Sequence, residues 1–403
     1  MRGSGIKRGE PFPEWHGVFP RLVLTPKNDI EVERAFAFAK KEGLKAVITG
    51  LGGRLSWLKR PESGFLLIKT SLMKEVFTFD RPNLSIEIGA GMSLSEIDAF
   101  LKERGCFFPL DPFDLDALTI GGAYQTNALG GISGSFGQVK DLVLGVELKT
   151  PAFPRVHFGA HVIKNVSGYD LRRFLAGAFG EFGLVSKMVL RVYPRPEVEA
   201  RFVAIPKSMD GLGGLLGLVQ QEGTELTRAV FVKKANEPRP TLFAGIAGEE
   251  GLCRLKTVRF QDRLMKEGVE AEIILEAIED FTLEAFRRDR LIPGRGGEMP
   301  GFLAGFGLDA ALEVIRALQD EAGVEYLMVP RLGRAFLWAR AQADTEDASG
   351  LKALQGLHGV KVRALPFYRD GGKPSEGGGV WPILSKIRSV FDPEGVIGTG
   401  MFS

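Results

Sequence analysis

Apolar and polar residues in the first half of the chain alternate between a helix period and a strand period. A 3.6-residue pattern over 30–41 that ends at Gly43 predicts a helix. Short apolar runs predict strands at 46–49, 66–69 and 85–88. A further helix is expected over 93–104, where Ser93 and Glu96 have the spacing of a capping box. The first half therefore mixes helices and strands.

A different order of elements begins after Pro194-Arg195-Pro196, which we interpret as a domain boundary. The expected elements are strand 201–205, helix 212–221, strands 228–233 and 241–247, helix 252–266 and strand 270–275. This β-α-β-β-α-β order is typical of a ferredoxin-like domain. A Gly-rich interruption at 293–300 precedes a similar alternation. Its expected elements are strand 301–306, helix 310–322 and strands 326–329 and 335–340, followed by a linker at 373–379 and a helix at 382–391.

The composition is that of a folded globular protein without a strong charge preference. Of the 403 residues, 44% are hydrophobic and 25% are charged, and the formal net charge is +2, so neither disorder nor a nucleic-acid partner is favoured. Cys106 and Cys253 are too few for a disulfide framework or a four-cysteine iron-sulfur cluster. No signal peptide pattern and no run long enough to span a membrane are visible. We therefore expect a cytoplasmic protein.

Three glycine-rich segments carry the functional argument. The first, Gly50-Leu51-Gly52-Gly53-Arg54-Leu55-Ser56, follows an expected strand, where bare backbone N–H groups suit a pyrophosphate. The nicotinamide dinucleotide fingerprint is not matched, because Leu55 stands where its third glycine would be and Trp57 and Pro61 oppose a long helix. A tight turn without a ligand explains this segment equally well.

The second segment extends from Pro109 to Asp141 and contains Gly121, Gly122, Gly130 and Gly131. Its small residues permit a planar ligand to approach the backbone closely. The polar side chains expected to offer hydrogen-bond partners to such a ligand are Thr119, Thr126 and Asn127. The alternative is a glycine-rich surface loop, which would be long for a compact domain.

The third segment spaces Gly177, Gly180 and Gly183 three residues apart, which lets backbone pack closely and direct N–H groups at a ligand. Together the three segments suggest a flavin site. Lys164, in the polar turn before the third segment, and Arg54 are the candidate cations to favour electron uptake. A solvated cation or a structural salt bridge is the alternative for both, and for Arg54 a phosphate contact is a further possibility.

The residues resemble the FAD-binding domains of the vanillyl-alcohol oxidase or PCMH type, and within it the family of FAD-binding E subunits of glycolate oxidase. The motifs that carry the resemblance are Thr119-Ile120-Gly121-Gly122 and the stretches 141–145, 164–170, 177–185, 193–196 and 391–397. The resemblance implies an α+β fold, in which a two-subdomain FAD-binding domain is joined to a ferredoxin-like α/β cap. We expect the FAD-binding domain over 1–196, the cap over 197–372, and a C-terminal segment over 373–403 that packs back on the first domain.

The resemblance implies non-covalent FAD, since no His or Cys lies within the three glycine segments. Its pyrophosphate is expected on the first segment and further contacts on the other two. The expected cofactor-binding residues are Gly50, Leu51, Gly52, Gly53, Arg54, Leu55, Ser56, Pro109, Thr119, Gly121, Gly122, Thr126, Asn127, Gly131, Lys164, Gly177, Ala178, Gly180, Gly183 and Val185.

The sequence also departs from the family pattern. Ala178 replaces a small polar residue, and Gly398-Thr399 stands where the family has Asn-Pro. The His-rich motif late in the chain of the catalytic D-type subunits is absent. No carboxylate pattern makes a metal site of the four histidines, so no metal is expected. The four histidines are His16, His157, His161 and His358.

We therefore predict an FAD-binding oxidoreductase subunit of a glycolate or D-lactate oxidase-like complex. The subunit is expected to relay electrons from a catalytic flavoprotein partner to an iron-sulfur partner. Any association of this subunit with a membrane is expected to be peripheral and through its partners. One alternative is a self-sufficient FAD-dependent 2-hydroxy acid dehydrogenase, with Tyr326, Arg334 and Tyr368 as polar groups that form no convincing base. The other is a structural subunit that has lost the cofactor. The catalytic residues stay unknown.

Overall fold

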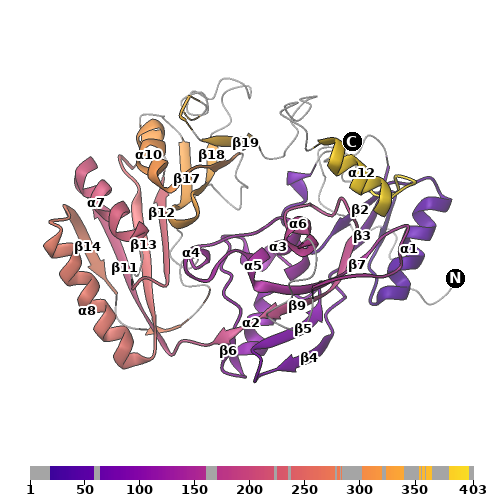
Figure 1. The fold of residues 1–403 in the computed structure, drawn as a ribbon, viewed down its shortest axis with the longest axis horizontal. Helices are drawn as coiled ribbons and strands as arrows, with labels where there is room; N and C mark the ends of the chain where they lie inside the picture. Colours follow the sequence, from indigo (N-terminus) through magenta and orange to yellow (C-terminus); the bar gives the residue numbers. More distant parts are fainter. Residues whose placement is uncertain are drawn as a thin grey trace.

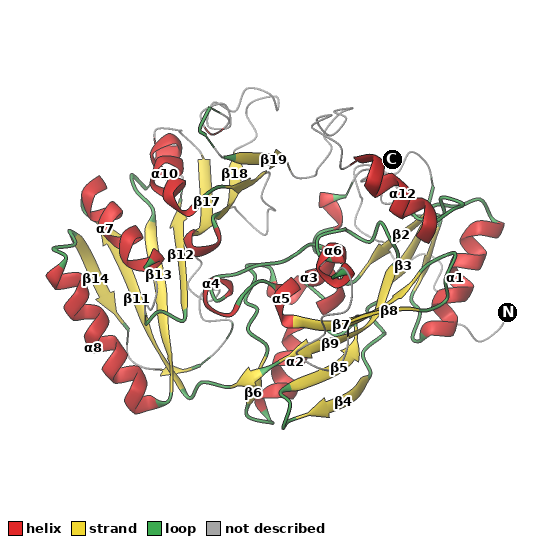
Figure 2. Ribbon diagram, viewed as in Figure 1, coloured by secondary structure: helices red, strands yellow, loops and turns green. Residues whose placement is uncertain are grey.

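The computed structural model describes residues 19–58, 64–159, 170–221, 225–234, 237–276, 279–281, 283, 302–319, 324–339, 354, 356–358, 360–364 and 381–398. Within them, the strands form sheets of three, five and nine strands and one two-stranded pair. Figure 1 shows the nine-stranded sheet with its helices on one side of the molecule and the two smaller sheets on the other. The helices and strands are mixed throughout (Figure 2).

The first sheet is small and parallel. Its strands are β1 (Leu22–Leu24), β2 (Ala46–Thr49) and β3 (Leu66–Lys69), in the order β1-β3-β2. Helix α1 (Asp29–Lys41) connects β1 to β2, as parallel strands require a crossover. Asn28 caps this helix by accepting from the Glu31 N–H, and the buried face of α1 includes Val32 and Phe36. Strand β2 leads directly into residues 50–53, which we call the glycine loop, so this loop lies at the carboxyl end of the sheet.

The second sheet is antiparallel. Its strands are β4 (Val76–Asp80), β5 (Ser85–Gly89), β9 (Leu184–Arg191), β7 (Val143–Lys149) and β8 (Val156–Gly159), in this order. Helix α2 (Leu94–Lys102) packs beside it, with the predicted Ser93–Glu96 capping box present. All seven residues of β7 are buried.

Short elements connect this sheet to its surroundings. They are β6 (Cys106–Phe107), which pairs with β10 (Tyr193–Pro194), η1 (Leu55–Trp57), η2 (Leu115–Ala117), α3 (Ile120–Gln125), α4 (Ser133–Phe136), α5 (Val139–Leu142) and α6 (Leu171–Leu175). Asp170 accepts from the Arg173 N–H and so caps α6. In the described residues, which stop at 58 and resume at 64, the glycine loop is followed by the single turn η1 and not by the long helix that a dinucleotide fingerprint would open.

The nine-stranded sheet begins with a ferredoxin-like unit. Its elements are β11 (Val198–Pro206), α7 (Met209–Gln220), β12 (Arg228–Lys233), β13 (Thr241–Gly248), α8 (Glu250–Lys266) and β14 (Ala271–Leu275). The strands lie in the order β14-β11-β13-β12, and β15 (Glu279–Asp280) also pairs with β11. The predicted β-α-β-β-α-β arrangement is confirmed.

A second unit continues the same sheet. Its elements are β16 (Phe302–Gly305), η3 (Leu308–Ala310), α10 (Ala311–Gln319), β17 (Val324–Val329), η4 (Pro330–Leu332), β18 (Arg334–Ala339) and β19 (Lys361–Ala364). Its strands follow as β17-β18-β16-β19, the mirror of the first order, and β12 pairs with β17 where the units meet. The cap is thus two similar units joined edge to edge by their second strands.

One face of the cap sheet packs on its helices and the other meets the half of the molecule that contains the two smaller sheets. Phe231 and Leu242 are buried with α7, α8 and α10, whereas Val230 and Val232 belong to a separate cluster. That cluster joins the cap to Trp57, Leu58, Leu129 and Phe179 of the other half. The alternation of a strand, which sends neighbouring side chains to opposite faces, therefore divides β12 between the two cores.

The C-terminal residues return to the first sheet. Helix α12 (Trp381–Phe391) leads to Val396, whose carbonyl accepts from the Ala46 N–H at 2.7 Å, while the Gly398 N–H donates to the Ala46 carbonyl at 2.8 Å. Ile397 forms a parallel bridge with Ala46. This stretch covers the outer edge of β2.

The Gly-rich interruption at 293–300, the linker at 373–379, Lys164, Tyr368, His16 and His161 lie outside the described residues. The exact domain limits at 196 and 372 stay predictions. None of the described helices is both long and apolar enough to cross a membrane.

Candidate functional site: a glycine-lined pocket

A pocket lies where β2 ends, between the glycine loop, the segment from η2 to the end of α3, and the turn before β9. It contains about 640 Å³ of space that protein atoms do not fill, part of it open to solvent. The carboxyl end of a parallel strand is the usual position of a ligand site in α/β proteins. All three glycine-rich segments of the sequence therefore contribute to one site.

The glycine loop offers unpaired donors. Within the described residues, the backbone N–H groups of Gly50, Leu51, Gly52 and Gly53 donate to no recorded acceptor. Gly52 has a φ of +94°, a conformation that side chains other than glycine rarely adopt. Successive free N–H groups on such a turn form an anion-binding site.

Two glycines allow the loop to approach the second segment. A Cβ on Gly50 would lie 2.2 Å from Thr119 Oγ1, and one on Gly53 would lie 2.6 Å from the Ala117 carbonyl oxygen. Both distances are far below a van der Waals contact. Glycine at these positions therefore sets the width of the pocket.

Helix α3 forms the second wall, and its own hydrogen bonds are already satisfied. The N–H groups of Ile120 and Gly121 donate to the carbonyls of Met92 and Ala90, and the Gly122 N–H donates to Thr119 Oγ1. The N-terminus of α3 is therefore paired within the protein. Anion binding falls to the glycine loop instead.

Gln125, which the sequence analysis did not select, ties α3 to the third wall. Its carbonyl accepts from the Phe179 N–H at 2.9 Å and its side-chain Oε1 accepts from the Gly180 N–H at 3.0 Å. Phe179 and Gly180 both have a positive φ. A Cβ on Gly183 would lie 2.5 Å from the Lys149 carbonyl oxygen, so this turn lies directly against β7.

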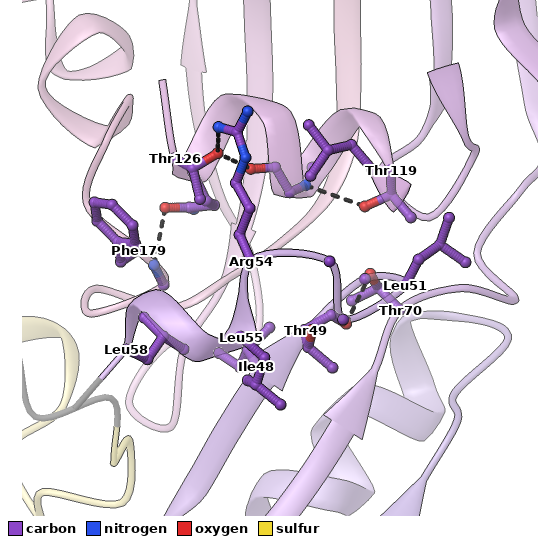
Figure 3. A pocket seen from close by; sticks show the side chains of 18 of the residues that line it. Ile48, Thr49, Leu51, Arg54, Leu55, Leu58, Thr70, Thr119, Thr126 and Phe179 are labelled. Atoms are coloured by element: carbon purple, nitrogen blue, oxygen red, sulfur yellow. Dashed lines mark hydrogen bonds between the residues drawn. The ribbon is translucent and has the colours of Figure 1, made fainter. Parts of the chain in front are cut away.

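Of the described residues that line the pocket, Arg54 alone carries a charge. Figure 3 shows its side chain extending from the loop to Thr126 at the end of α3. Its guanidinium donates to both carboxylate oxygens of Asp114 and to Thr126 Oγ1, which in turn donates to the Gly122 carbonyl. The structural salt bridge that was an alternative for Arg54 is thus present. The Thr126 hydroxyl both accepts and donates a hydrogen bond within the protein.

Most of the expected cofactor residues meet in this pocket. Those that line it are Gly50, Leu51, Gly52, Gly53, Arg54, Leu55, Thr119, Gly121, Gly122, Thr126, Gly180, Gly183 and Val185. The lining residues that were not expected are Ile48, Thr49, Leu58, Thr70, Ala117, Leu118, Gln125 and Phe179. Ile48 and Thr49 end the predicted strand 46–49, so the rule that ligands bind at strand ends would have identified them.

Five other expected residues with described side chains lie outside this lining, whereas Lys164 and the side chain of Ser56 are not described. Pro109 is buried, and Gly177 donates to the Tyr124 carbonyl. Asn127 donates to Gln138 Oε1 at 3.1 Å. Two further residues fall outside the pocket for reasons of packing, since Ala178 is buried and Gly131 accepts from Ala229 of the cap.

A charged cluster joins the half of the molecule that contains the pocket to the cap. Arg228, on β12, has no exposed surface and pairs with Glu199 at 2.7 Å and with Asp111 at 3.4 Å. Burial raises the pKa of Asp111 to about 6, against the lowering effect of Arg228. Burial likewise raises the pKa of Glu199, and Arg228 and Arg201 oppose this. Both carboxyl groups therefore depend on Arg228 to stay ionised.

Tyr326, a polar group weighed for a general base, is buried in the helix-side core of the cap. Its hydroxyl has no hydrogen-bond partner within the described residues, and burial raises its pKa. Tyr326 is therefore separate from the pocket. In the described part of the chain, no three His, Cys, Asp or Glu side chains are grouped to hold a metal ion.

The pocket fits FAD. The pyrophosphate of FAD is an anion and needs donors, and the glycine loop supplies four N–H groups without recorded partners in the described chain. The walls are built of glycines and of apolar residues such as Ile48, Leu51 and Leu55, as a planar aromatic ligand requires. The residues present therefore match both parts of the cofactor.

Comparisons with known proteins agree with this fit. Residues 20–152 match the family model described as FAD binding domain. Glycolate oxidase subunit GlcD of Bacillus subtilis is 28% identical over 192 residues, which cover 47% of this chain and 41% of the relative. Glycolate oxidase subunit GlcE of Escherichia coli is 32% identical over 151 residues, which cover 37% and 43%. The mitochondrial D-lactate dehydrogenase [cytochrome] of Arabidopsis thaliana is 24% identical over 263 residues, which cover 62% and 46%.

Solved structures extend the likeness to the whole fold. FgChi7B has a TM-score of 0.72 at 15% identity, covering 98% of this chain and 96% of that one. The wild-type BBE-like 1 protein of Physcomitrella patens has a TM-score of 0.70 at 16% identity, covering 94% and 90%. The chain spans less than half of the length of the curated relatives it matches. Residues 20–152 are thus similar to an FAD binding domain, the chain as a whole shares the fold of these solved structures, and FAD is its cofactor.

Proposed function

We propose that the chain is the FAD-binding subunit of an oxidoreductase that oxidises a 2-hydroxy acid such as glycolate or D-lactate, and that it passes electrons to an iron-sulfur partner. The observation that carries the proposal is the pocket in which three glycine segments meet around a loop with free N–H groups. The names of the relatives, which include glycolate oxidase subunits and a D-lactate dehydrogenase, support the choice of substrate class. When bound, FAD would supply an electron carrier that accepts from the catalytic partner the electrons released by oxidation of the hydroxy acid.

The chain's own residues bind and shield the cofactor. The N–H groups of the glycine loop would hold the pyrophosphate, while Leu51 and Ile48 offer apolar surface. Trp57, Leu58 and Phe179 pack against the cap and close one side of the site to water. In the described chain no group is positioned as a convincing general base, which is consistent with a subunit that receives its electrons from a catalytic partner.

The test is the anaerobic absorption spectrum of the purified chain before and after addition of glycolate or D-lactate. We expect an oxidised-flavin band that persists with either acid alone and bleaches after the catalytic and iron-sulfur partners are added. Chemical reduction with dithionite, which should bleach the band in every case, shows that the flavin is competent. Bleaching by the acid alone would instead favour the self-sufficient dehydrogenase. A chain that binds no FAD even when FAD is added would refute the proposal.

A further inference from the structure

We propose that Arg54 and Asp114 form a positioning pair, which holds the glycine loop in the shape that binds FAD, and that Arg54 does not itself bind the pyrophosphate. The inference rests on FAD binding in this pocket. It assigns a role to Arg54, for which the sequence alone does not distinguish a phosphate contact from a structural salt bridge. The contacts of Arg54 with all its neighbours carry the argument.

The pair joins elements that are far apart in sequence. The Arg54 Nε and Nη2 atoms donate to the two carboxylate oxygens of Asp114, each at 2.7 Å, and Nη1 donates to Thr126 Oγ1 at 2.8 Å. Arg54 follows the glycine loop directly, Asp114 precedes η2, and Thr126 ends α3. The Arg54 guanidinium therefore joins the glycine loop to both ends of the neighbouring pocket wall, which extends from η2 to α3.

The pair is buried and its geometry is specific to arginine. The side chains of Arg54 and Asp114 are only 3% and 8% exposed. The guanidinium carbon lies 4.5 Å from the ring centre of Trp57 and 5.6 Å from that of Phe113. A planar, forked group satisfies the carboxylate and the ring faces together, whereas lysine has neither the fork nor the plane.

A phosphate role for Arg54 would conflict with this arrangement. Three of its five N–H groups, one on each nitrogen atom, donate to protein oxygens, and the side chain that carries the other two is only 3% exposed. Turning the guanidinium toward an anion in the pocket would leave the buried Asp114 carboxylate without its partner, which is unfavourable. The loop N–H groups, which have no recorded partner in the described residues, are the donors available to the pyrophosphate.

The consequence for binding follows from the flexibility of glycine. A loop with glycines at 50, 52 and 53 has many conformations open to it when nothing restrains it. A fixed loop binds more tightly than one that must be ordered by the ligand. Loss of either partner of the pair should therefore weaken FAD binding, even though neither contacts the cofactor.

The experiment measures the affinity of the apoprotein for FAD by fluorescence titration. We expect Asp114→Asn and Arg54→Lys each to weaken binding about tenfold, and the double variant to be no weaker than either single variant, because one pair accounts for both effects. If Arg54 bound the pyrophosphate directly, Asp114→Asn would release it and leave FAD binding unchanged or tighter. That result would overturn the inference.

The matched control is Asp98→Asn, which breaks the partly buried Arg195–Asp98 pair (2.6 Å) in the same half of the molecule but outside the pocket. It should lower the melting temperature and leave FAD affinity within about twofold. Thr126→Val, which removes only the third contact of Arg54, serves if Asp114→Asn does not fold, and it should weaken binding by a smaller factor. Unchanged affinity in Thr126→Val would then count against the inference.

Hydrogen exchange of the loop amides gives a second readout. Exchange of residues 50–54 in the apoprotein should be faster in Asp114→Asn than in the wild type and unaffected in Asp98→Asn. A wild-type chain that binds no FAD would overturn the cofactor assignment and this inference together. Wild-type binding with no weakening in Asp114→Asn would overturn this inference alone.

Discussion

Replacement of Arg228 by methionine should destabilise the chain and make its stability strongly dependent on pH. Methionine keeps the apolar stem but removes the cation between Asp111 and Glu199, whose side chains are 4% and 0% exposed. Without Arg228 we expect the folded protein to keep Asp111 protonated at pH 7. Since the unfolded value of its pKa is 3.8, this costs about 4 kcal/mol. Removal of one partner from a buried ion pair usually costs about 3 to 5 kcal/mol in total, and we expect a loss of this size for the variant at neutral pH.

The direction of the pH dependence follows from proton linkage. In the variant the folded state holds a proton that the unfolded state releases above pH 3.8, so stability falls as the pH rises. The wild type already loses about 3 kcal/mol from Asp111 by pH 7, because the pKa of this group is about 6 in the fold. The loss in the variant relative to the wild type should therefore be about 1 kcal/mol larger at pH 7 than near pH 4, where Asp111 is protonated in both folded proteins. The assay is urea unfolding of both proteins at pH 4, 5.5 and 7.

The control is Arg263→Met, which breaks the more exposed pair with Glu225, where the side chains are 26% and 15% exposed. It should lose less than about 1 kcal/mol at every pH. A loss in Arg228→Met that is equally small, or one that is the same at pH 4 and pH 7, would refute the claim that Arg228 keeps Asp111 and Glu199 ionised.

Three further predictions concern single positions. Gly53→Ala places a Cβ 2.6 Å from the Ala117 carbonyl oxygen, so FAD titration should show at least about tenfold weaker binding, and wild-type affinity would contradict the account of the pocket's width. Ser93→Ala removes the capping box of α2 and should cost about 1 kcal/mol in urea unfolding, whereas no loss would show that the cap is unimportant. The pKa of Asp111 is about 6 in the folded protein and 3.8 in the unfolded chain. The free energy of unfolding that this group contributes to the wild type is therefore highest below pH 4 and is lost as the pH rises through 6. Asp111→Asn should lack this fall of about 3 kcal/mol, and an unchanged pH profile of unfolding would contradict it.

Much of the fold could be predicted because its strands are continuous apolar runs with clear turns. The runs 46–49, 66–69 and 228–233 are strands with these same bounds, and the order of the cap elements was correct. Strand β7 is different, since it buries Glu147 and Lys149. Their burial depends on each other and on Asp29, which is 3.1 Å from Lys149 Nζ. Two charged residues interrupt the apolar residues near the end of this strand, so the sequence pattern does not show that all seven are buried. The burial of Lys149 depends in part on Asp29, which is distant in sequence.

The parts of the site that are built from glycine could be predicted from the sequence. Close approach of backbone requires glycine whatever the neighbours are, so all three segments could be selected from sequence. The contributions of Gln125 and Asp114 could not, because they arise from contacts with residues more than 50 positions away. No rule of spacing connects Arg54 to Asp114. The mirrored order of the two cap units likewise appears only once strand pairing is known.

The bridge between Ala46 and Ile397 has a consequence for synthesis of the chain in the cell. The outer edge of β2 is covered by residues that leave the ribosome roughly 20 to 70 s after β2 itself, at about 5 to 20 residues per second. Until then the edge is an unpaired template next to the buried residues Ala46 and Val47. The strand that leads into the glycine loop therefore gains its outer neighbour only after residues 396–398 have been synthesised, so a chain truncated before them should expose this edge to pairing with other chains.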